Sequence, residues 1–356
     1  MFFDGDVRMT TVPPVVVHPV AGLLAKANPL AGDVLAFATT LPELALIQFQ
    51  GPDVISFLQG QITNDMLMVN ASQARLAGYC TAQGRLLASA VFWQSQPSPD
   101  GSTNVTALLR RDILASTQQR LSMFVLRAKV KIQPLETTAP VGVTVKGTGL
   151  DALQKRLGHD LPAQAWQVVQ APTGTWIAAP KEDASTHRFW WVAGQDHVLA
   201  IANLEGLFAP SLMGQWQASD IRAGLPWITA ATRDLFIPQT LNLDLIEGIS
   251  FTKGCYPGQE VVARSHYRGT LKRRMAMGWT TGEDVALASD IIEPTDPDHP
   301  CGRVISQAKD QDKLWLLFEC TFDALSRGDL RMAGEAGSRI HLLPLPYAVP
   351  RPAQSS

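Results

Sequence analysis

The sequence predicts an α+β fold that ends in a small β-barrel, and three observations lead to this class. The 356 residues, 46% of them hydrophobic, suffice for a globular chain of two or three domains at roughly 100–200 residues each. The middle of the chain mixes short strand-like and helix-like stretches, without the regular strand–helix alternation of a doubly wound sheet. After about Thr270 the pattern becomes strand, turn, strand, which is typical of a small barrel or sandwich.

The individual elements follow from local patterns. Residues 1–40 are expected to be an extended lead-in, because four prolines prevent a regular helix there. Order is expected to begin near Leu41, and Asp53 is placed to start a helix. Gly84 is expected to supply the turn of a strand pair. The expected strands are 44–49, 74–81, 85–93, 105–109, 129–132, 141–145, 175–179, 189–192, 275–280, 302–306, 314–318 and 340–343, and the expected helices include 53–58 and 111–124.

Changes in these patterns suggest domain boundaries. Residues 41–270 are expected to form two interwoven α+β domains, and residues 271–349 the C-terminal β-barrel domain. Residues 350–356 are expected to be a tail.

Composition and spacing exclude several classes of protein. The formal net charge of −2 excludes a polycation, so a contact with nucleic acid would need a local basic patch. The cysteines are far apart and the histidines show no metal-pair spacing, so we expect no disulfide scaffold, no metal site and no self-held iron–sulfur cluster. No stretch approaches the roughly 20 apolar residues of a membrane span. We therefore expect a cytoplasmic protein without a membrane partner.

One segment, residues 251–264, carries candidate chemistry. Gly254 and Gly258 bracket Cys255, and such spacing makes a tight loop that holds a side chain outward. Residues 253–274 contain six Lys or Arg and one acid, a local charge of +5. Positive charge favours the reactive thiolate and also attracts anions. On the residues alone, a small buried cysteine beside a solvated basic hairpin is an equally good interpretation.

The sequence of this segment, Lys253-Gly-Cys-Tyr-Pro-Gly-Gln-Glu260, resembles a motif of the YgfZ family of folate-binding proteins. That family is related in fold to the aminomethyltransferase (T-protein) of the glycine cleavage system. The resemblance covers roughly residues 41–347, whereas the lead-in shares nothing recognisable. Other segments that agree with the family are Phe57-Leu-Gln-Gly-Gln-Ile-Thr-Asn-Asp65, Ala82-Gln-Gly-Arg85, Ile221-Arg-Ala-Gly-Leu-Pro226, Phe236-Ile-Pro-Gln239, Gly248-Ile-Ser-Phe251 and Leu343-Pro-Leu-Pro-Tyr347.

The resemblance implies a three-domain, ring-like arrangement of the T-protein type around a cavity that accepts tetrahydrofolate or a derivative. It implies a role in iron–sulfur cluster assembly or repair, with effects on iron–sulfur-dependent tRNA modification. The implied partners are a reduced folate, iron–sulfur assembly proteins or client enzymes, and tRNA in transient contact.

The resemblance also implies which residues carry the function. Cys255 is then the functional thiol, with Lys253 beside it as the second catalytic candidate. An aromatic wall for a flat pterin could come from Trp216, Trp227, Tyr256 or Phe251, although core packing is the commoner role of each taken alone. The residues expected to bind the folate are Asn64, Asp65, Arg85, Arg222, Gln239, Tyr256, Gln259, Glu260, Arg264 and Arg268.

Whether the chain is itself an enzyme stays open at this point. The related transferases carry an Asp after the strand-pair turn that anchors the pterin, and the matching positions here are Ala88 and Ser89, which have no carboxylate. Their T-G-Y-T-G-E-x-G-type run also has no match between His187 and Ile201. Aminomethyl transfer in the glycine cleavage system is therefore disfavoured.

Two alternatives remain beside the accessory role. One is a folate-dependent one-carbon transferase that uses other residues. The other is an RNA-binding module in tRNA modification, in which a basic run would contact phosphates, although no RNA-binding motif accompanies it. The residues of that run are Arg264, Arg268, Lys272, Arg273 and Arg274.

Overall fold

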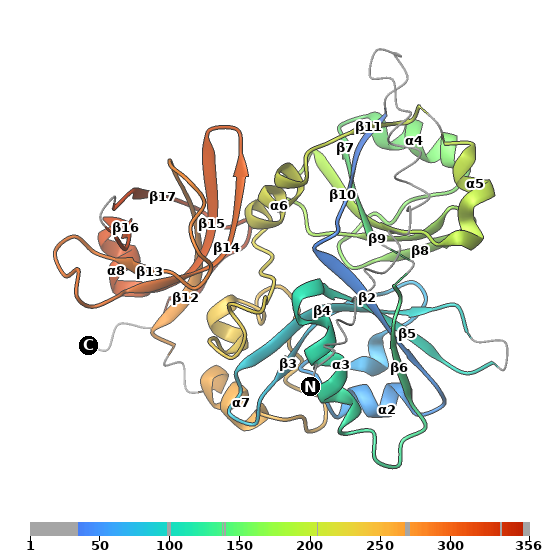
Figure 1. Ribbon diagram of the computed structural model, residues 1–356, viewed down its shortest axis with the longest axis horizontal. Helices are drawn as coiled ribbons and strands as arrows, with labels where there is room; N and C mark the ends of the chain where they lie inside the picture. Colours follow the sequence, from blue (N-terminus) through green and yellow to red (C-terminus); the bar gives the residue numbers. More distant parts are fainter. Residues whose placement is uncertain are drawn as a thin grey trace, which may run out of the picture.

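Three β-sheets surround a central segment made of helix α6 (Met213–Arg222) and the long loop after it (Figure 1). The computed structural model describes residues 35–97, 101–136, 138, 140–204, 206–267, 271–334 and 337–351. Two of the sheets are open and lie on one side of this segment, and a closed six-stranded barrel lies on the other. The expected α+β class and the C-terminal barrel are confirmed.

The five-stranded sheet has the order β3-β4-β5-β2-β6, and all its neighbouring strands are antiparallel. Residues 86–93 are all buried, which explains their nearly continuous apolar run. Asp53 precedes the first helix as expected, but its carboxylate accepts from the backbone N–H of Lys129 (2.7 Å) instead of capping that helix. The elements are β2 (Leu44–Gln50), α2 (Val54–Gln59), η1 (Met66–Met68), β3 (Arg75–Cys80), β4 (Leu86–Ser95), β5 (Asn104–Arg110), η2 (Arg111–Ile113), α3 (Leu114–Ser122) and β6 (Lys131–Pro134).

The six-stranded sheet, of order β11-β1-β7-β10-β9-β8, joins distant parts of the chain. Its strand β1 (Ala36–Thr40) pairs in parallel with β11 (Phe208–Pro210), so sheet structure starts before Leu41, where order was expected. The core side chains of β1 are two alanines, which are too small to give a clear apolar pattern. The other elements are β7 (Pro140–Lys146), α4 (Gly149–Leu157), β8 (Val168–Ala171), β9 (Gly174–Ala178), β10 (Thr186–Val192), η3 (Gln195–His197) and α5 (Val198–Ala202).

The barrel closes in the order β12-β15-β14-β13-β16-β17, so it leaves no free sheet edge. The four expected barrel strands fall within β12, β14, β15 and β17. The two shortest strands, β13 and β16, were not expected. The elements are β12 (Arg273–Thr280), β13 (Asp290–Ile292), β14 (Gly302–Asp310), β15 (Lys313–Thr321), α8 (Phe322–Arg327), β16 (Leu330–Met332) and β17 (Arg339–Leu343).

The connections hold the three sheets together. Between α6 and the barrel the chain forms η4 (Pro238–Leu241) and α7 (Gln259–Tyr267). After β17 the chain returns to the centre, where the hydroxyl of Tyr347 donates to the carbonyl oxygen of Gly224 (2.9 Å). Among the described residues, no helix has both the length and the apolar character that a membrane crossing requires.

Candidate functional site

The loop that carries Cys255 packs against the turn between β3 and β4. Gly258 has a φ of +84°, in the left-handed region that favours glycine. A Cβ atom at this position would lie 2.4 Å from the carbonyl oxygen of Thr81 and 2.6 Å from Cα of Gly84. Only glycine therefore lets the two turns approach this closely. Cys255 is exposed and its thiol is free, so the thiol faces solvent from a fixed loop.

Lys253 is buried, in contrast to Cys255. Its Nζ donates to the carbonyl oxygens of Gln59 (2.5 Å) and Ile62 (2.6 Å), at and just beyond the end of α2. Burial lowers the pKa of Lys253 to about 8, and the negative charges of Asp65 and Cys255 oppose this shift. The ammonium group thus ties the loop to α2 and lies close enough to interact electrostatically with the thiol.

Asn64 and Asp65 form part of the frame beneath the loop. The Nδ2 of Asn64 donates to the carbonyl oxygens of Leu76 (2.7 Å) and Glu247 (2.6 Å), and its Oδ1 accepts from the backbone N–H of Asp65 (2.8 Å). The Asp65 carboxylate accepts from the backbone N–H of Leu67 and from the side chain of Gln59, both at 3.0 Å. Both side chains therefore bond to the protein itself.

Gln239 and Tyr256 connect the same frame to its surroundings. Gln239 is fully buried, and its Nε2 donates to the carbonyl oxygen of Val262 in α7. Tyr256 is also buried, and this burial raises the pKa of its hydroxyl. Its ring centre lies 5.0 Å from Nζ of Lys253, within the range of a cation–π contact. Gln259 is half-buried at the start of α7.

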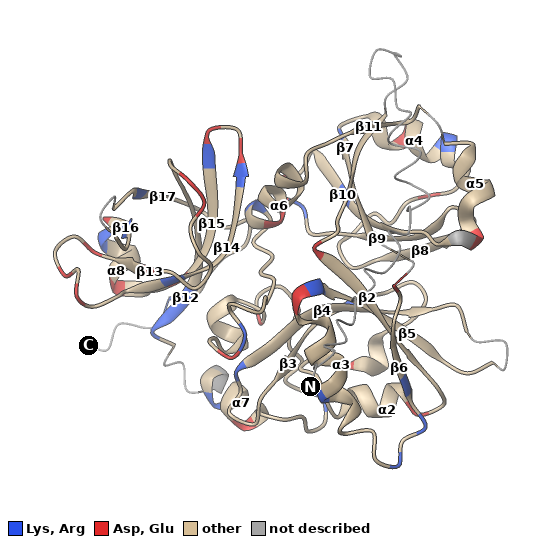
Figure 2. Ribbon diagram, in the orientation of Figure 1, with Lys and Arg blue, Asp and Glu red and all other residues tan. Residues whose placement is uncertain are grey.

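Most of the basic run is paired with acids. Arg264 pairs with Glu260 (2.7 Å) on the exposed side of α7, and Arg273 pairs with Glu319 (3.1 Å). Arg274 is buried and makes two bonds to Asp244, of 2.5 and 2.9 Å. Figure 2 accordingly shows acidic residues beside basic ones at α7. Lys272 is exposed, and Arg268 lies outside the described residues. Two acids from other parts of the chain, Glu319 and Asp244, therefore reduce the local charge of +5 to +3.

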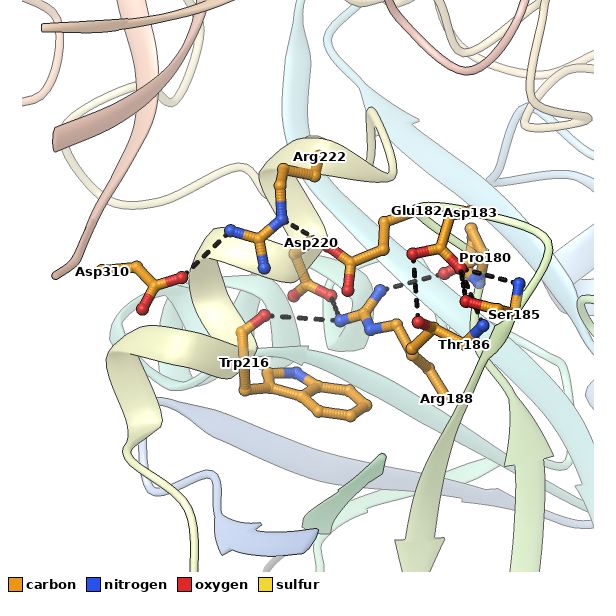
Figure 3. Close-up of polar contacts among 10 residues, drawn as sticks. All are labelled: Pro180, Glu182, Asp183, Ser185, Thr186, Arg188, Trp216, Asp220, Arg222 and Asp310. Carbon is orange, nitrogen blue, oxygen red and sulfur yellow. Dashed lines mark hydrogen bonds and ion pairs between the residues drawn. The ribbon is translucent and has the colours of Figure 1, made fainter. Parts of the chain in front are cut away.

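The two remaining expected residues lie on different elements. Arg85 donates to the carbonyl oxygen of Leu235 (2.6 Å) and so holds the long loop against the β3–β4 turn. Arg222, at the end of α6, pairs with Glu182 and with Asp310 (3.1 Å), as Figure 3 shows. Arg222 thus ties the six-stranded sheet to the barrel, and Figure 1 places α6 apart from α7. The expected site residues therefore form a group around Cys255 and a separate position on α6.

A cavity of about 200 Å³, the central cavity, lies between the five-stranded sheet, the barrel, and α6 with the loop after it. It combines apolar walls with convergent polar groups, which is typical of a small-molecule site. Of the expected aromatic walls, Trp227 lines this cavity, whereas Trp216 packs beneath the guanidinium of Arg188 (4.2 Å to the ring centre). Its lining residues are Glu43, Leu44, Arg110, Gln217, Asp220, Ile221, Leu225, Trp227, Thr229, Leu287, Ser306 and Gln307.

Asp220 is buried at the wall of the cavity and is held by two donors. One oxygen pairs with the buried Arg188, and the other accepts from Nε1 of Trp227 (2.9 Å) (Figure 3 shows the pair with Arg188). Burial raises the pKa of Asp220, while the charge of Arg188 opposes this shift. The pair fixes α6 against β10 and orients the indole of Trp227.

Glu43 and Arg110 present polar atoms that have no partner. Oε2 of Glu43 and Nε of Arg110 are buried and bond to nothing among the described residues. Burial raises the pKa of Glu43, while Arg110 and a hydrogen bond from Gln217 oppose this shift. Neither residue belongs to a motif, and Glu43 precedes β2 while Arg110 ends β5. Only the tertiary structure brings them together, so sequence analysis had no signal for them.

Ser89 and Ala88 serve the structure at the positions where the transferases carry acids. Oγ of Ser89 accepts from the backbone N–H of Ile228 (3.0 Å) and donates to the carbonyl oxygen of Pro226 (3.4 Å). Ala88 is buried opposite Tyr79 in the β3–β4 pair. Ser89 thus holds the loop that carries Trp227.

Comparison with known proteins identifies the family of the chain. No family model matches it. It is 32% identical over 337 residues to the tRNA-modifying protein YgfZ of Edwardsiella ictaluri, covering 90% of this chain and 95% of that protein. The chain belongs to the YgfZ family. It is also 30% identical to the YgfZ protein of Yersinia pestis strain Pestoides F, over 87% of this chain and 92% of that one. The family assignment made from the Cys255 loop is confirmed.

The fold resembles that of a solved aminomethyltransferase T of the glycine cleavage system from Bartonella henselae. The TM-score is 0.59 at 11% identity, and the alignment covers 90% of this chain and 88% of the other. At this identity the likeness establishes the fold alone. This YgfZ family member therefore has the T-protein fold that the sequence resemblance implied.

The residues of the central cavity fit part of a folate. The cavity is smaller than most ligand pockets, which measure roughly 300–1,000 Å³, so it can enclose only part of that molecule. A flat pterin suits the wall formed by Trp227, and the charged residues Glu43 and Arg110 line the same cavity. None of the residues that line the cavity belongs to the Cys255 loop.

Proposed function

We propose that this YgfZ family protein binds a reduced folate and supports iron–sulfur cluster assembly or repair, and through it an iron–sulfur-dependent tRNA modification. One observation carries the folate part. A cavity between the five-stranded sheet, the barrel and the central segment has an aromatic wall, Trp227, and two charged lining residues, Glu43 and Arg110. Apolar and aromatic walls with a few polar groups are typical of a small-molecule site.

The proposed role in tRNA modification rests on the curated relatives, which are named tRNA-modifying proteins. The proposed iron–sulfur role rests on Cys255. Iron–sulfur clusters are held by thiolates, and an exposed thiol on a fixed loop can offer one ligand to iron from outside. Lys253 places a positive charge close enough to interact electrostatically with the thiol. Cys255 and Lys253 are therefore the proposed functional pair.

Titration with tetrahydrofolate, followed by intrinsic tryptophan fluorescence, tests the folate part. We expect saturation in the micromolar range or below, a binding free energy of about −8 kcal/mol. Trp227→Phe should remove most of the fluorescence change, because this indole lines the cavity. Trp279→Phe is the matched control, since Trp279 lies in the barrel strand β12 and stacks on His341. No saturation up to millimolar folate would overturn the proposal.

Alkylation and complementation test the thiol. At neutral pH Cys255 should react with iodoacetamide at least a hundredfold faster than Cys80, Cys301 and Cys320, which are buried. Cys255→Ala should fold normally yet fail to support iron–sulfur enzymes and tRNA modification in cells that lack the native protein. Cys80→Ala, at a fully buried position, is the contrasting variant and should act through stability instead. Full complementation by Cys255→Ala would remove the thiol from the function.

The other two candidate functions have less support. For an aminomethyl-type transferase, Ser89 and Ala88 offer no carboxylate and are engaged in packing. For an RNA-binding module, three of the five basic candidates are paired with acids. We expect no aminomethyl transfer to tetrahydrofolate by the purified protein. Folate-dependent turnover with an aminomethyl donor would instead favour the aminomethyl-type transferase over the accessory role.

A further inference from the structure

Two of the buried cysteines lie next to each other in the barrel. Cys301 directly precedes β14, and Cys320 lies in β15 opposite Gly302, the first residue of β14. The backbone N–H of Thr321 donates to the carbonyl oxygen of Cys301 (3.0 Å), so the two segments are held together at this point. Both side chains belong to the hydrophobic cluster of the barrel, and both thiols are free.

This placement suits a disulfide. Residues opposite each other on antiparallel strands have Cα atoms roughly 4.5–5.5 Å apart, and Cys301 lies one position along the chain from the residue opposite Cys320. The Cα atoms of the two cysteines are therefore about 6 Å apart, within the range of about 4.4–6.8 Å that disulfides span. A Cβ atom built on Gly302 would lie 3.3 Å from Sγ of Cys320, so this sulfur reaches toward the start of β14. The thiol of Cys301 is held in place as well, because it donates to the carbonyl oxygen of Ile291 (3.3 Å).

A hydrogen bond between the two thiols gives them different acidities. It lowers the pKa of Cys301, and Arg273 acts in the same direction, whereas burial and the charge of Glu293 oppose this shift. The same bond, together with burial, raises the pKa of Cys320. Cys301 is also the more accessible of the two, with 7% of its surface exposed against 0% for Cys320. Because the thiolate is the reactive form of cysteine, Cys301 is the better nucleophile of the pair.

We propose that Cys301 and Cys320 form a reversible disulfide on exposure to a peroxide, with Cys301 as the attacking sulfur and Cys320 as the thiol that resolves the intermediate. This oxidation site lies in the barrel and does not depend on the proposed function of Cys255. Cys80 is less suited to the reaction, because it lies in the five-stranded sheet and burial raises the pKa of its thiol.

The reaction balances with hydrogen peroxide as the oxidant. In the first step the sulfur of Cys301 attacks one peroxide oxygen and the O–O bond breaks, which gives a sulfenic acid on Cys301 and one water. In the second step Sγ of Cys320 attacks the sulfur of Cys301, the S–S bond forms, and the sulfenic hydroxyl leaves as a second water with the proton of Cys320. Two thiols thus lose two electrons in total while one peroxide is reduced to two waters. A dithiol such as dithiothreitol restores both thiols by exchange.

Peptide mapping of the wild-type protein tests the proposal. The reduced protein is treated with hydrogen peroxide, and the remaining thiols are then blocked with N-ethylmaleimide in acidic urea, which suppresses exchange. Trypsin should release residues 275–303, which contain Cys301, and residues 314–327, which contain Cys320. We expect these two peptides to be joined after peroxide treatment and separate after dithiothreitol. The link should form at least tenfold faster in the folded protein than in protein unfolded in urea, because the fold holds the two sulfurs together.

Two variants separate the roles of the two sulfurs. Cys320→Ala removes the resolving thiol, so oxidation should stop at the sulfenic acid of Cys301, and labelling of that peptide by dimedone should rise at least tenfold. Cys80→Ala is the matched control at another fully buried cysteine and should keep the link between the two peptides. Thermal unfolding of each variant reports whether it folds, and the wild-type peptide map needs no variant at all.

Three results would overturn the proposal. The first is that both thiols stay reduced at a peroxide concentration that oxidises the exposed Cys255. The second is that the link forms only after the protein has been unfolded. The third is that Cys301 or Cys320 joins Cys80 or Cys255 instead of its neighbour in the barrel.

Discussion

The Cys255 loop and the central cavity both rest on polar groups taken out of water, but they use these groups differently. Around the loop, Lys253 and Asn64 bond to backbone carbonyl oxygens of the protein. In the cavity, Glu43 and Arg110 keep buried atoms that bond to no described group. The loop therefore uses polar bonds to hold one thiol in place, whereas two charged residues of the cavity wall keep buried atoms without a hydrogen-bond partner among the described residues.

This difference separates residues that hold the loop in place from residues that could bind a ligand. A sequence motif alone does not distinguish the two kinds. The segments that agree with the family include residues of the loop and its frame, because tight turns and buried amides tolerate few alternatives. Residues that read a ligand need only point into the same space. Hydrogen bonds to the backbone of the protein itself, more than membership of a motif, thus mark Lys253 and Asn64 as scaffold residues.

The largest expected effect is on the packing of the loop. Gly258→Ala should lower the free energy of unfolding by about 3–4 kcal/mol, because it adds a Cβ 2.4 Å from a backbone oxygen at a left-handed φ. Gly254→Ala is the control in the same loop, since its Cβ would meet no described atom within 4 Å. Denaturant unfolding measures both, and an equal effect of the two would contradict the packing of the loop on the β3–β4 turn.

A smaller effect is expected at Asn64, which tests the comparison directly. Asn64→Ala should lower the free energy of unfolding by about 2–3 kcal/mol, because it leaves the carbonyl oxygens of Leu76 and Glu247 without their donor. Tetrahydrofolate affinity, measured by calorimetry below the melting temperature, should change less than threefold. A tenfold loss of affinity without loss of stability would return Asn64 to the direct folate contact that the family resemblance implies.

Lys253 should show an intermediate loss and a distinct dependence on pH. Lys253→Met should lower the free energy of unfolding at pH 7 by about 1–2 kcal/mol, since two carbonyl oxygens lose a donor. The folded-state pKa of about 8 lies below the ordinary 10.5, so the unfolded chain binds more protons between these values. The contribution of Lys253 to stability should therefore rise as the pH rises from 8 to 10.5.

The measurement for this pH dependence is the difference in unfolding free energy between wild type and Lys253→Met across that range. Taking the difference removes the titration of the other groups. Lys272→Met is the control, because Lys272 is exposed and should give a flat difference. A flat difference for Lys253 as well would mean that its ammonium is not desolvated in the folded protein.

The smallest effect is expected on the surface of α7. Arg264→Ala breaks the exposed pair with Glu260 and should change the unfolding free energy by less than about 0.5 kcal/mol. It should also leave folate binding unchanged if the pair serves only the helix surface. A marked loss of folate affinity would instead support the contact that the family resemblance implies for Arg264.

The sequence predicts those strands and turns that depend on residues close together along the chain. The strands now seen as β3 and β4 were expected because apolar residues flank a Gly-containing turn, and the barrel strands because turns separate them. The parallel pairing of β1 with β11 was not predictable, since it joins residues about 170 positions apart through small side chains. Long-range pairing leaves no local pattern to read.

The site residues also divide into those that the local sequence predicts and those that it does not. The exposed thiol of Cys255 and its glycine-bounded loop follow from a short run of residues. Glu43 stands before a strand and Asp220 within a helix, and neither position differs in sequence from an ordinary surface or helix residue. Arg222, grouped by resemblance with the Cys255 loop, lies on another element, because a motif records similarity and not distance.

The bond between Tyr347 and Gly224 has a consequence for how the protein is made. Domains begin to fold while the ribosome is still extending the chain, at about 5–20 residues per second. The five-stranded sheet uses no strand beyond Pro134, so its whole complement of strands can emerge early. The fastening of the chain's end to the segment after α6 must wait for Tyr347, more than 120 positions later than its partner. Nascent chains stalled before that point should therefore lack the bond that fastens the segment after β17 to the loop after α6.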